Sequence, residues 1–211
     1  MLIYDFMDIL TITDYIGIAS AALSGFLFGV RKSCDWLGLF IAAFLTALGG
    51  GIIRDVLVGR EIYSFSNYLP VIIVIFMMIL AVVLNLHKKQ DIEDKFFFIF
   101  TDAIGIVSFS LVGTMVTINH DYNVFGVVLI AFANGVGGGI LRDVLLNEVP
   151  WLLRTGLYGT ISMGVGLAYF CLYKLGFANV FSVIALLILG VTIRVFAYYR
   201  SWNLPKVGYE K

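Results

Sequence analysis

Two arginine–aspartate pairs lie inside the most hydrophobic parts of the chain, each shortly after three consecutive glycines. Residues 49–57 read GGGIIRDVL and residues 137–145 read GGGILRDVL. Charged side chains are costly in an apolar segment, so they usually find partners in the protein interior or line an aqueous path for ions or solutes. The sequence offers no Ser/His/Asp or Cys/His set for nucleophilic catalysis. The two motifs therefore indicate transport across a membrane rather than an enzyme.

The composition is typical of a membrane protein. Hydrophobic residues make up 61% of the chain, charged residues 13%, and the mean hydropathy is +0.99. The 14 basic and 14 acidic residues balance, so no polycationic surface indicates nucleic acid as a partner. The two histidines and two cysteines show no spacing typical of metal ligands, and we expect neither a metal nor a cofactor. The sequence predicts an all-α membrane protein.

Seven segments are apolar and long enough to cross a hydrocarbon core of about 30 Å, which takes roughly 20 helical residues. The predicted spans are about 15–30, 36–59, 68–87, 98–118, 122–147, 155–174 and 178–199. The connections between them are short, so residues 1–211 are expected to form a single transmembrane domain.

The basic residues in the connections predict the orientation of the chain, because Lys and Arg concentrate on the cytoplasmic side. With the N-terminus outside, only Arg60 and Lys174 lie on the outer side, while nine basic residues lie inside. These nine are Arg31, Lys32, Lys88, Lys89, Lys95, Arg154, Arg200, Lys206 and Lys211. The C-terminus is therefore predicted to be cytoplasmic in a multi-pass protein.

The chain contains an internal repeat. A shift of 88 residues aligns 13–57 with 101–145 without a gap, and 19 of these 45 positions are identical. Three spans per copy is an odd number, so the second copy enters the membrane from the opposite side, as in the inverted repeats of many transporters. We expect repeats at 13–88 and 101–174, followed by an extra helix at 178–199.

Each glycine triplet is predicted near the middle of its span. The two triplets are Gly49, Gly50 and Gly51 in span 2, and Gly137, Gly138 and Gly139 in span 5. Because a glycine costs a helix about 1 kcal/mol relative to alanine, both helices are expected to kink or break there. Exposed backbone groups within a bilayer must be buried in protein or face water, which favours a polar path between the two spans. Close packing of two bare backbones is the alternative explanation.

The charged residues that follow the triplets are expected to form one layer on each side of the midplane. Neighbouring helical residues point about 100° apart, so we expect Arg54 and Arg142 to bond to other helices rather than to the adjacent Asp55 and Asp143. The alternative is that the arginines snorkel to headgroups while the aspartates brace the structure. Arg194 is also expected to snorkel.

Other polar residues hold equivalent positions in the two repeats. Asp14 and Asp102 each follow a threonine at the start of a predicted span, and are interpreted as helix N-caps. Thr46 and Asn134 lie one turn before the triplets, so they could face a pore or satisfy an interrupted backbone.

These features resemble the prokaryotic members of the trimeric intracellular cation (TRIC) channel family. The chain is also similar to the related bacterial inner-membrane family for which glycine transport has been proposed. The resemblance rests on the doubled GGGxxRD motif and on the 3+3+1 arrangement of spans, and it covers nearly the whole chain. The Lys-Glu-Val motif of animal TRIC channels is absent, so their lipid and voltage regulation is not implied.

The resemblance implies a homotrimer in the inner membrane, in contact with membrane lipids. Each protomer would carry a pore for monovalent cations, chiefly K⁺, between spans 2 and 5. Carried over by position, the pore residues would be Gly49, Gly50, Gly51, Arg54, Asp55, Gly137, Gly138, Gly139, Arg142 and Asp143.

Three functions are compatible with the sequence. Helix N-termini after the triplets, together with two arginines, would suit the carboxylate of glycine or another small amino acid in a transporter. Carbonyl groups before the triplets, with the aspartates neutralising the arginines, would suit a cation channel. A structural subunit without transport would bury and pair all these charges. The resemblance favours the channel.

Overall fold

The computed structural model describes residues 2–88, 92–118, 120–154 and 157–204, and the regular secondary structure in these ranges is helical. In chain order the helices are α1 (Leu2–Arg31), α2 (Trp36–Val58), α3 (Tyr63–Ser66), α4 (Leu69–Val83), the 3₁₀ helix η1 (Leu86–Lys88), α5 (Ile92–Ile118), α6 (Val124–Leu145), α7 (Trp151–Arg154), α8 (Tyr158–Lys174) and α9 (Val180–Tyr199). No strand occurs in these ranges. The predicted all-α membrane fold is confirmed.

Five helices, α1, α2, α5, α6 and α9, are long and apolar enough to cross a membrane. The other two predicted spans correspond to shorter helices, α4 with 15 residues and α8 with 17. At 1.5 Å per residue these reach about 22 and 26 Å, less than a hydrocarbon core of about 30 Å. Residues 155 and 156, at the start of the sixth predicted span, lie outside the described residues. Seven crossings therefore remain a prediction.

The local backbone of the two repeats matches at several positions. Asp35 caps the start of α2 and Asn123 caps the start of α6, each accepting a hydrogen bond from the N–H three residues later. The turns before these caps contain left-handed residues at equivalent places, Ser33 (φ 54°) and Asp121 (φ 53°). The sequence repeat is thus also a repeat of local geometry.

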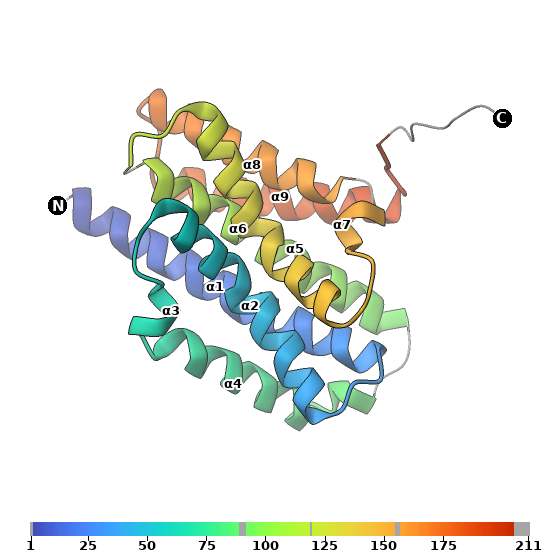
Figure 1. Cartoon of the computed structure of the whole chain (residues 1–211). Coiled ribbons are helices and arrows are strands. Elements are labelled where there is room, and N and C mark those ends of the chain that lie inside the picture. The colour runs from blue at the N-terminus through green and yellow to red at the C-terminus, as the bar shows by residue number, and fades with distance from the viewer. Residues whose placement is uncertain (1, 89–91, 119, 155–156, 205–211) are drawn as a thin grey trace.

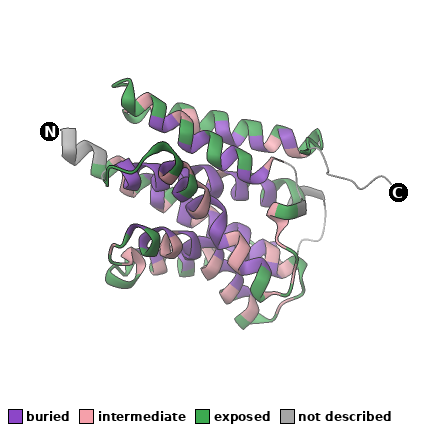
Figure 2. Cartoon of the chain, turned by 45° about the horizontal axis from the view of Figure 1, so that its top comes forward, coloured by how far each residue is buried: buried purple, intermediate pink, exposed green. Residues whose placement is uncertain are grey.

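Equivalent helices of the two repeats pack against each other. α1 lies along α5 and α2 lies along α6, and in Figure 1 both pairs run in opposite directions. α4 packs on α1 and α2, whereas α9 packs on α5 and α8. Buried residues gather between the helices, while the outward faces of the bundle are exposed (Figure 2). The charged motifs of α2 and α6 are consequently held inside the bundle.

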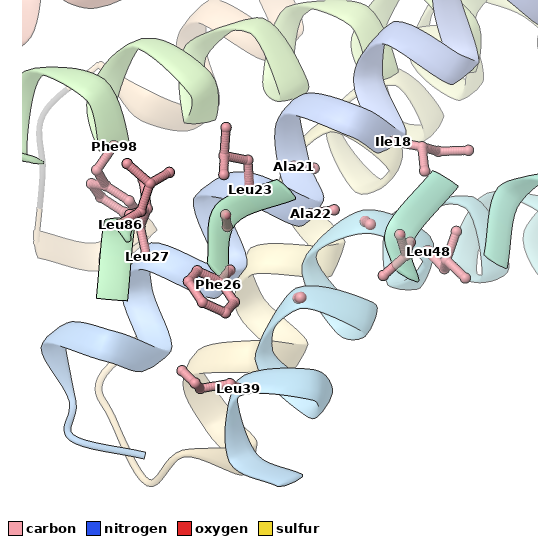
Figure 3. Close-up of a cluster of buried hydrophobic side chains, with 14 of the residues drawn as sticks. Ile18, Ala21, Ala22, Leu23, Phe26, Leu27, Leu39, Leu48, Leu86 and Phe98 are labelled. Carbon is pink, nitrogen blue, oxygen red and sulfur yellow. The ribbon is translucent and has the colours of Figure 1, made fainter. Parts of the chain in front are cut away.

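Small residues on α1 allow α2 to approach closely. A Cβ added to Gly25 would lie 2.5 Å from the Ala42 carbonyl oxygen, and one added to Gly29 would lie 2.9 Å from the Leu39 side chain. Larger apolar side chains, including the fully buried Phe26, fill the space between α1, α2 and α5 (Figure 3). This contact positions the first half of α2 against α1.

Two helices begin earlier than their hydropathy indicates. α1 begins at Leu2 and α5 at Ile92, so Asp14 and Asp102 lie well inside helices. Their interpretation as N-caps is wrong. Hydropathy marks where a helix becomes apolar, but the backbone hydrogen bonds extend several turns further toward the N-terminus.

Candidate functional site

The helices α2 and α6 cross at their glycine triplets. A Cβ added to Gly50 would overlap the Asn134 carbonyl oxygen, and one added to Gly138 would overlap the Thr46 carbonyl oxygen. Both helices continue through the triplets without interruption. The predicted break is therefore wrong, and no half-helix ends face each other at this point. Close packing accounts for these glycines, while a bend remains a prediction.

The third glycine of each triplet faces an arginine rather than the opposite helix. A Cβ added to Gly51 would lie 3.6 Å from Nη2 of Arg54. A Cβ added to Gly139 would lie 3.8 Å from Nη2 of Arg142 and 3.3 Å from the Tyr158 hydroxyl. Both guanidinium groups thus fold back along their own helices into space next to a glycine.

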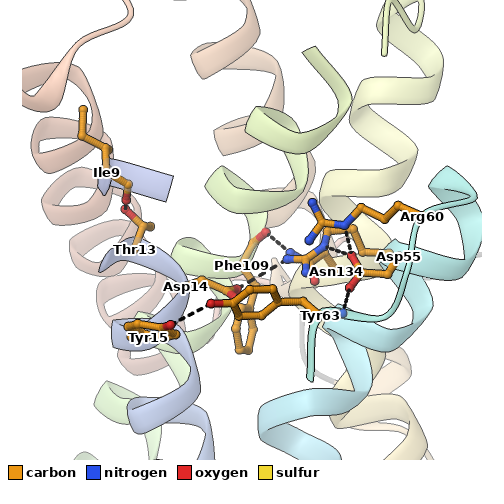
Figure 4. Close-up of polar contacts among 10 residues, drawn as sticks. Ile9, Thr13, Asp14, Tyr15, Asp55, Arg60, Tyr63, Phe109 and Asn134 are labelled. Carbon is orange, nitrogen blue, oxygen red and sulfur yellow. Dashed lines mark hydrogen bonds and ion pairs between the residues drawn. The ribbon is translucent and has the colours of Figure 1, made fainter. Parts of the chain in front are cut away.

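The Arg54 cluster consists of Asp14, Arg54, Asp55, Arg60 and Tyr63. Figure 4 labels all of these residues except Arg54. Arg54 donates from Nε to Oδ1 of Asp55 at 2.7 Å, and its Nη1 lies 3.4 Å from Oδ1 of Asp14. Arg60 donates from Nε to the same Asp55 oxygen at 2.8 Å. Two arginines and two aspartates balance the charge of this cluster, which joins α1 to α2.

The Arg142 cluster consists of Asp102, Arg142, Asp143, Tyr158 and Arg194. Arg142 donates to Oδ1 of Asp143 from Nε at 2.9 Å and from Nη2 at 2.8 Å. The Tyr158 hydroxyl lies 3.4 Å from Oδ1 of Asp102. The guanidinium carbon of Arg194 lies 4.7 Å from the centre of the Tyr158 ring, within cation–π range. This cluster joins α5, α6, α8 and α9.

Each arginine therefore pairs with its own neighbouring aspartate, and the prediction that it could not is wrong. The predicted bond to another helix is confirmed for Arg54, which reaches Asp14 of α1. The 100° offset between neighbouring residues fixes the directions of the Cβ atoms only. An arginine side chain has several rotatable bonds beyond Cβ, so its guanidinium can curl around the helix to reach the adjacent carboxylate.

The arginines do not snorkel. Arg54 is 1% exposed, Arg142 is 0% exposed and Arg194 is 2% exposed. The prediction for Arg194 is wrong because its guanidinium lies against the rings of Tyr158 and Trp151. The guanidinium carbon lies 5.7 Å from the centre of the Trp151 ring. Aromatic faces and nearby carboxylates thus replace lipid headgroups as its surroundings.

The two motif aspartates also brace the segment that follows each helix. Oδ2 of Asp55 accepts a hydrogen bond from the backbone N–H of Tyr63 at 2.9 Å, where α3 begins. Oδ2 of Asp143 accepts from the backbone N–H of Trp151 at 2.7 Å, where α7 begins. Tyr63 and Trp151 are themselves equivalent in the repeat. The aspartates hold two matching short helices in place.

Thr46 and Asn134 hydrogen-bond to backbone carbonyl groups near the crossing. The Thr46 hydroxyl donates to Ala42 of its own helix at 2.6 Å, and Nδ2 of Asn134 donates to Phe109 of α5 at 2.6 Å. Oδ1 of Asn134 is buried and has no hydrogen-bond partner in the described structure. Asn134 thus ties α6 to α5 directly beside the triplets.

Each cluster adjoins a cavity, and the two cavities lie at opposite ends of the crossing. The cavity beside Arg54 has a volume of about 20 Å³, enough for a single water molecule, and includes Asp14, Gly51 and Asp55 in its lining. The cavity beside Asp143, here called the vestibule, has a volume of about 330 Å³. Its lining residues are Phe28, Arg31, Lys32, Phe98, Asp143, Glu148, Val149 and Trp151.

No group of three metal-ligating side chains occurs in the part of the chain that the structure describes. Cys34 and Cys171 are both free thiols. The titratable groups of the two clusters are carboxylates, guanidinium groups and phenols.

Sequence reasoning missed several members of the clusters, namely Asp14, Arg60, Tyr63, Asp102, Tyr158 and Arg194. One signal could have found two of them. The Thr-Asp pairs at 13–14 and 101–102 are conserved between the repeats together with the Arg-Asp pairs. A carboxylate and an arginine retained in both copies indicate an ion pair between helices.

Comparison with known proteins gives a consistent picture. A protein-family model described as "Glycine transporter" matches residues 11–86 and again residues 99–174. The UPF0126 inner membrane protein YadS of Escherichia coli K12 is 29% identical over 161 residues, covering 76% of this chain and 77% of YadS.

Solved structures of TRIC channels share the fold over nearly the whole chain. A structure from work on conductance through TRIC cation channels is 30% identical, with a TM-score of 0.82 and coverage of 95% of this chain and 98% of that chain. A prokaryotic TRIC channel in 0.5 M KCl is 27% identical, with a TM-score of 0.84 and coverage of 94% and 100%. The chain therefore belongs to the membrane-protein family described as "Glycine transporter", which is related to the prokaryotic TRIC channels.

Proposed function

We propose that the protein is a K⁺-permeable channel for monovalent cations, with a pore in each protomer between α2 and α6. The carrying observation is the pair of carboxylate-lined cavities at opposite ends of the α2–α6 crossing. A cation approaching from either end would meet an aspartate next to an arginine, Asp55 at one end and Asp143 at the other. The likeness to TRIC cation channels supports the same function.

The crossing itself would be the gate. Gly50 and Gly138 bring the two backbones into contact, which leaves no space for a hydrated ion in the described conformation. Because the contact involves backbone rather than long side chains, conduction would require α2 and α6 to separate or bend at the triplets. A leucine at either position would wedge against the opposite backbone and block flux.

Recording from planar bilayers with the purified protein under a KCl gradient tests this function. Unitary currents that reverse near the K⁺ equilibrium potential are expected, and Gly50→Leu and Gly138→Leu should abolish them while still inserting into membranes. Full conductance in both variants would refute a pore at the crossing.

Asp55→Asn tests whether the clusters set ion preference. The substitution leaves Arg54 and Arg60 less compensated, so the ratio of K⁺ to Cl⁻ permeability should fall several-fold. The reversal potential under the same gradient measures this ratio. An unchanged ratio would restrict Asp55 to its hydrogen bond with the start of α3.

We further propose that the chain crosses the inner membrane seven times as an inverted 3+3 repeat plus α9, with an external N-terminus and a cytoplasmic C-terminus. The antiparallel packing of α1 with α5 and of α2 with α6 supports the inverted repeat. A homotrimer is proposed from the TRIC relationship alone, and cross-linking in native membranes would test it.

Two positions at opposite ends of the bundle, the half-buried Cys34 and the exposed Tyr68, test the orientation. Cys34 follows α1, and Tyr68, which is 85% exposed, precedes α4. A membrane-impermeant maleimide should label Tyr68→Cys in spheroplasts and Cys34 in inverted vesicles. Burial raises the pKa of the Cys34 thiol, and the nearby Asp35 adds to this effect. The thiolate fraction, and with it the labelling rate, should therefore increase as the pH is raised above neutrality.

Secondary transport of glycine or another small amino acid is the second candidate. The description of the family model favours it. Glycine accumulation in proteoliposomes, with no unitary current in bilayers, would support transport over conduction.

A further inference from the structure

A long apolar groove lies between α1 and α9, near the end of the bundle where both helices begin. Both helices pack on α5, but within the described residues they make few direct contacts with each other. The space between them is a cavity of about 620 Å³, here called the α1–α9 groove. Its apolar walls are formed by Ile9, Ile12 and Ile16 of α1 and by Val183, Ile184 and Leu187 of α9.

The α1–α9 groove faces the hydrocarbon of the membrane. Ile12, Ile16 and Ile184 on its walls are exposed, and they belong to two helices that are long and apolar enough to cross a membrane. From Asp8 to Ile16 the lining runs about 12 Å along α1 at 1.5 Å per residue, close to the roughly 15 Å of hydrocarbon in one leaflet. An empty groove at this depth would lose the dispersion contacts of its walls, so a hydrocarbon chain fills it.

The end of the groove nearest the start of the two helices is polar and acidic. Asp8 is the one charged residue among the described residues that line the groove, and Asn179 lies beside the start of α9. Oδ1 of Asn179 accepts a hydrogen bond from the backbone N–H of Ser182 at 3.0 Å, so its amide nitrogen is the group that can donate to a bound molecule. A carboxylate together with an amide donor suits a molecule that carries an ammonium group and a phosphate.

We propose that the α1–α9 groove binds an acyl chain of a phospholipid whose headgroup carries a primary ammonium group. The chain lies along Ile12 and Ile184, the ammonium group pairs with Asp8, and the phosphate accepts from Asn179. A choline headgroup carries the same positive charge but has no N–H to donate, and a headgroup with a net negative charge is repelled by Asp8. The lipid belongs to the leaflet at this end of the bundle, which is the outer leaflet in the orientation proposed above.

This site is separate from the proposed pore. The residues that line the groove come from α1, from α8 and from α9 with the turn before it, and none of them belongs to α2 or α6. Lipid binding at the groove therefore stands or falls independently of cation conduction at the crossing.

Native mass spectrometry of the purified full-length protein, delipidated and then titrated with dioleoyl lipids, tests the proposal. Phosphatidylethanolamine should bind saturably, with roughly threefold to fivefold higher affinity than phosphatidylcholine or phosphatidylglycerol, which is the range that an exposed ion pair gives. Equal affinity for the three lipids, or a preference for phosphatidylglycerol, would overturn the headgroup assignment. Absence of saturable binding would overturn the site altogether.

Asp8→Asn tests the contact with the headgroup. The substitution should abolish the preference for phosphatidylethanolamine over phosphatidylcholine and leave the affinity for phosphatidylcholine unchanged. Asp121→Asn is the matched control, because Asp121 is an exposed carboxylate outside the lining of the groove. A preference that survives in Asp8→Asn would refute the pairing of Asp8 with the ammonium group.

Ile12→Trp tests whether the chain lies in the groove, since an indole ring at this position would occupy the space between α1 and α9. Binding of all three lipids should weaken, whereas Ile72→Trp, at a similarly exposed position of α4, should leave it unchanged. Thermal unfolding without added lipid shows whether Ile12→Trp folds, and if it does not, Ile184→Trp takes its place with the same expectation. Unchanged binding in the folded variant would place the lipid elsewhere and refute the proposal.

Cross-linking in native membranes distinguishes a lipid from a second copy of the chain as the occupant of the groove. Ile12→Cys, combined with Cys34→Ser and Cys171→Ser, should remain uncross-linked when treated with a short bifunctional maleimide. Efficient formation of cross-linked dimers would show that a neighbouring protomer covers the groove, and would overturn the lipid as its occupant.

Discussion

Arg54 and Arg142 occupy equivalent positions, 88 residues apart in sequences that match at 19 of 45 positions, and each pairs with the aspartate that follows it. Their wider surroundings differ. Arg54 reaches Asp14, and Arg60 adds a second hydrogen bond to Asp55. Arg142 instead leaves Nη1 without a hydrogen-bond partner in the described structure. The Arg54 cluster thus satisfies its buried charged atoms with its own residues, whereas the Arg142 cluster leaves some of them without hydrogen bonds among the described residues.

The difference arises at positions where the repeats diverge. Arg60 of the first repeat is Glu148 in the second, and Glu148 pairs with Lys32. Pro70, which lines the cavity beside Arg54, corresponds to Tyr158. The extra helix α9 adds Arg194, which has no counterpart. The duplicated motif therefore has two different environments, because some neighbouring positions differ between the repeats and α9 lies outside them.

The largest expected effect concerns the buried ion pairs. Arg54→Gln should leave Asp14 without its cation, while Asp55 keeps Arg60. Arg142→Gln should leave Asp143 without its cation, while Asp102 keeps Arg194 nearby. Each change should cost roughly 3–5 kcal/mol of unfolding free energy, because it leaves one buried charge unpaired. Denaturant unfolding in mixed micelles measures this loss.

Second substitutions identify which aspartate is left unpaired. Asp14→Asn should restore much of the stability lost in Arg54→Gln, whereas Asp143→Asn should do so for Arg142→Gln. Rescue of Arg54→Gln by Asp55→Asn instead of by Asp14→Asn would contradict the geometry of the Arg54 cluster.

Alanine substitutions within the triplets should have the next largest effects. Gly50→Ala and Gly138→Ala place a methyl group against the opposite backbone, which should cost about 1–3 kcal/mol. Gly51→Ala has its nearest neighbour at 3.6 Å and should be neutral or slightly stabilising, since alanine favours a helix. Gly139→Ala is tighter, at 3.3 Å from the Tyr158 hydroxyl, and should be the less tolerated of the two.

Thermal unfolding of these four variants provides the measurement, with Gly51→Ala as the matched control. If Gly50→Ala and Gly51→Ala lost the same stability, the close crossing of α2 and α6 could not be the reason for the triplets.

The smallest expected losses of stability come from substitutions of Arg60 and Lys32, the charged residues near the position where the repeats carry Arg60 and Glu148. Arg60→Gln removes a hydrogen bond to the buried Asp55 and should cost more than Lys32→Gln, whose partner Glu148 is partly exposed. For Lys32→Gln we expect about 0–1 kcal/mol, decreasing in high salt because exposed ion pairs are screened. Unfolding at low and high KCl distinguishes the two, and equal salt dependence would contradict the difference in burial.

Hydropathy and the repeat predicted the helical fold and the charged motifs well, but helix ends and side-chain partners poorly. Asp14 and Asp102 were predicted as caps because apolar character begins after them, yet α1 and α5 extend further toward the N-terminus. Arg194 was predicted to snorkel because it lies near a helix end, yet Tyr158 and Trp151 enclose it. The first error concerns where a helix begins, and the second concerns a contact between segments far apart in the chain.

The sequence by itself determined that this is a helical membrane protein with a duplicated glycine-Arg-Asp motif, because composition, periodicity and repetition are properties of residue order. Only the tertiary structure decided that the triplets are a packing contact between continuous helices, and that Arg54 is enclosed while Arg142 retains a free donor. These outcomes depend on which side chains from distant segments share a site, and a flexible arginine can reach several of them. The packing of α1, α8 and α9 around the crossing determines which side chains each arginine contacts.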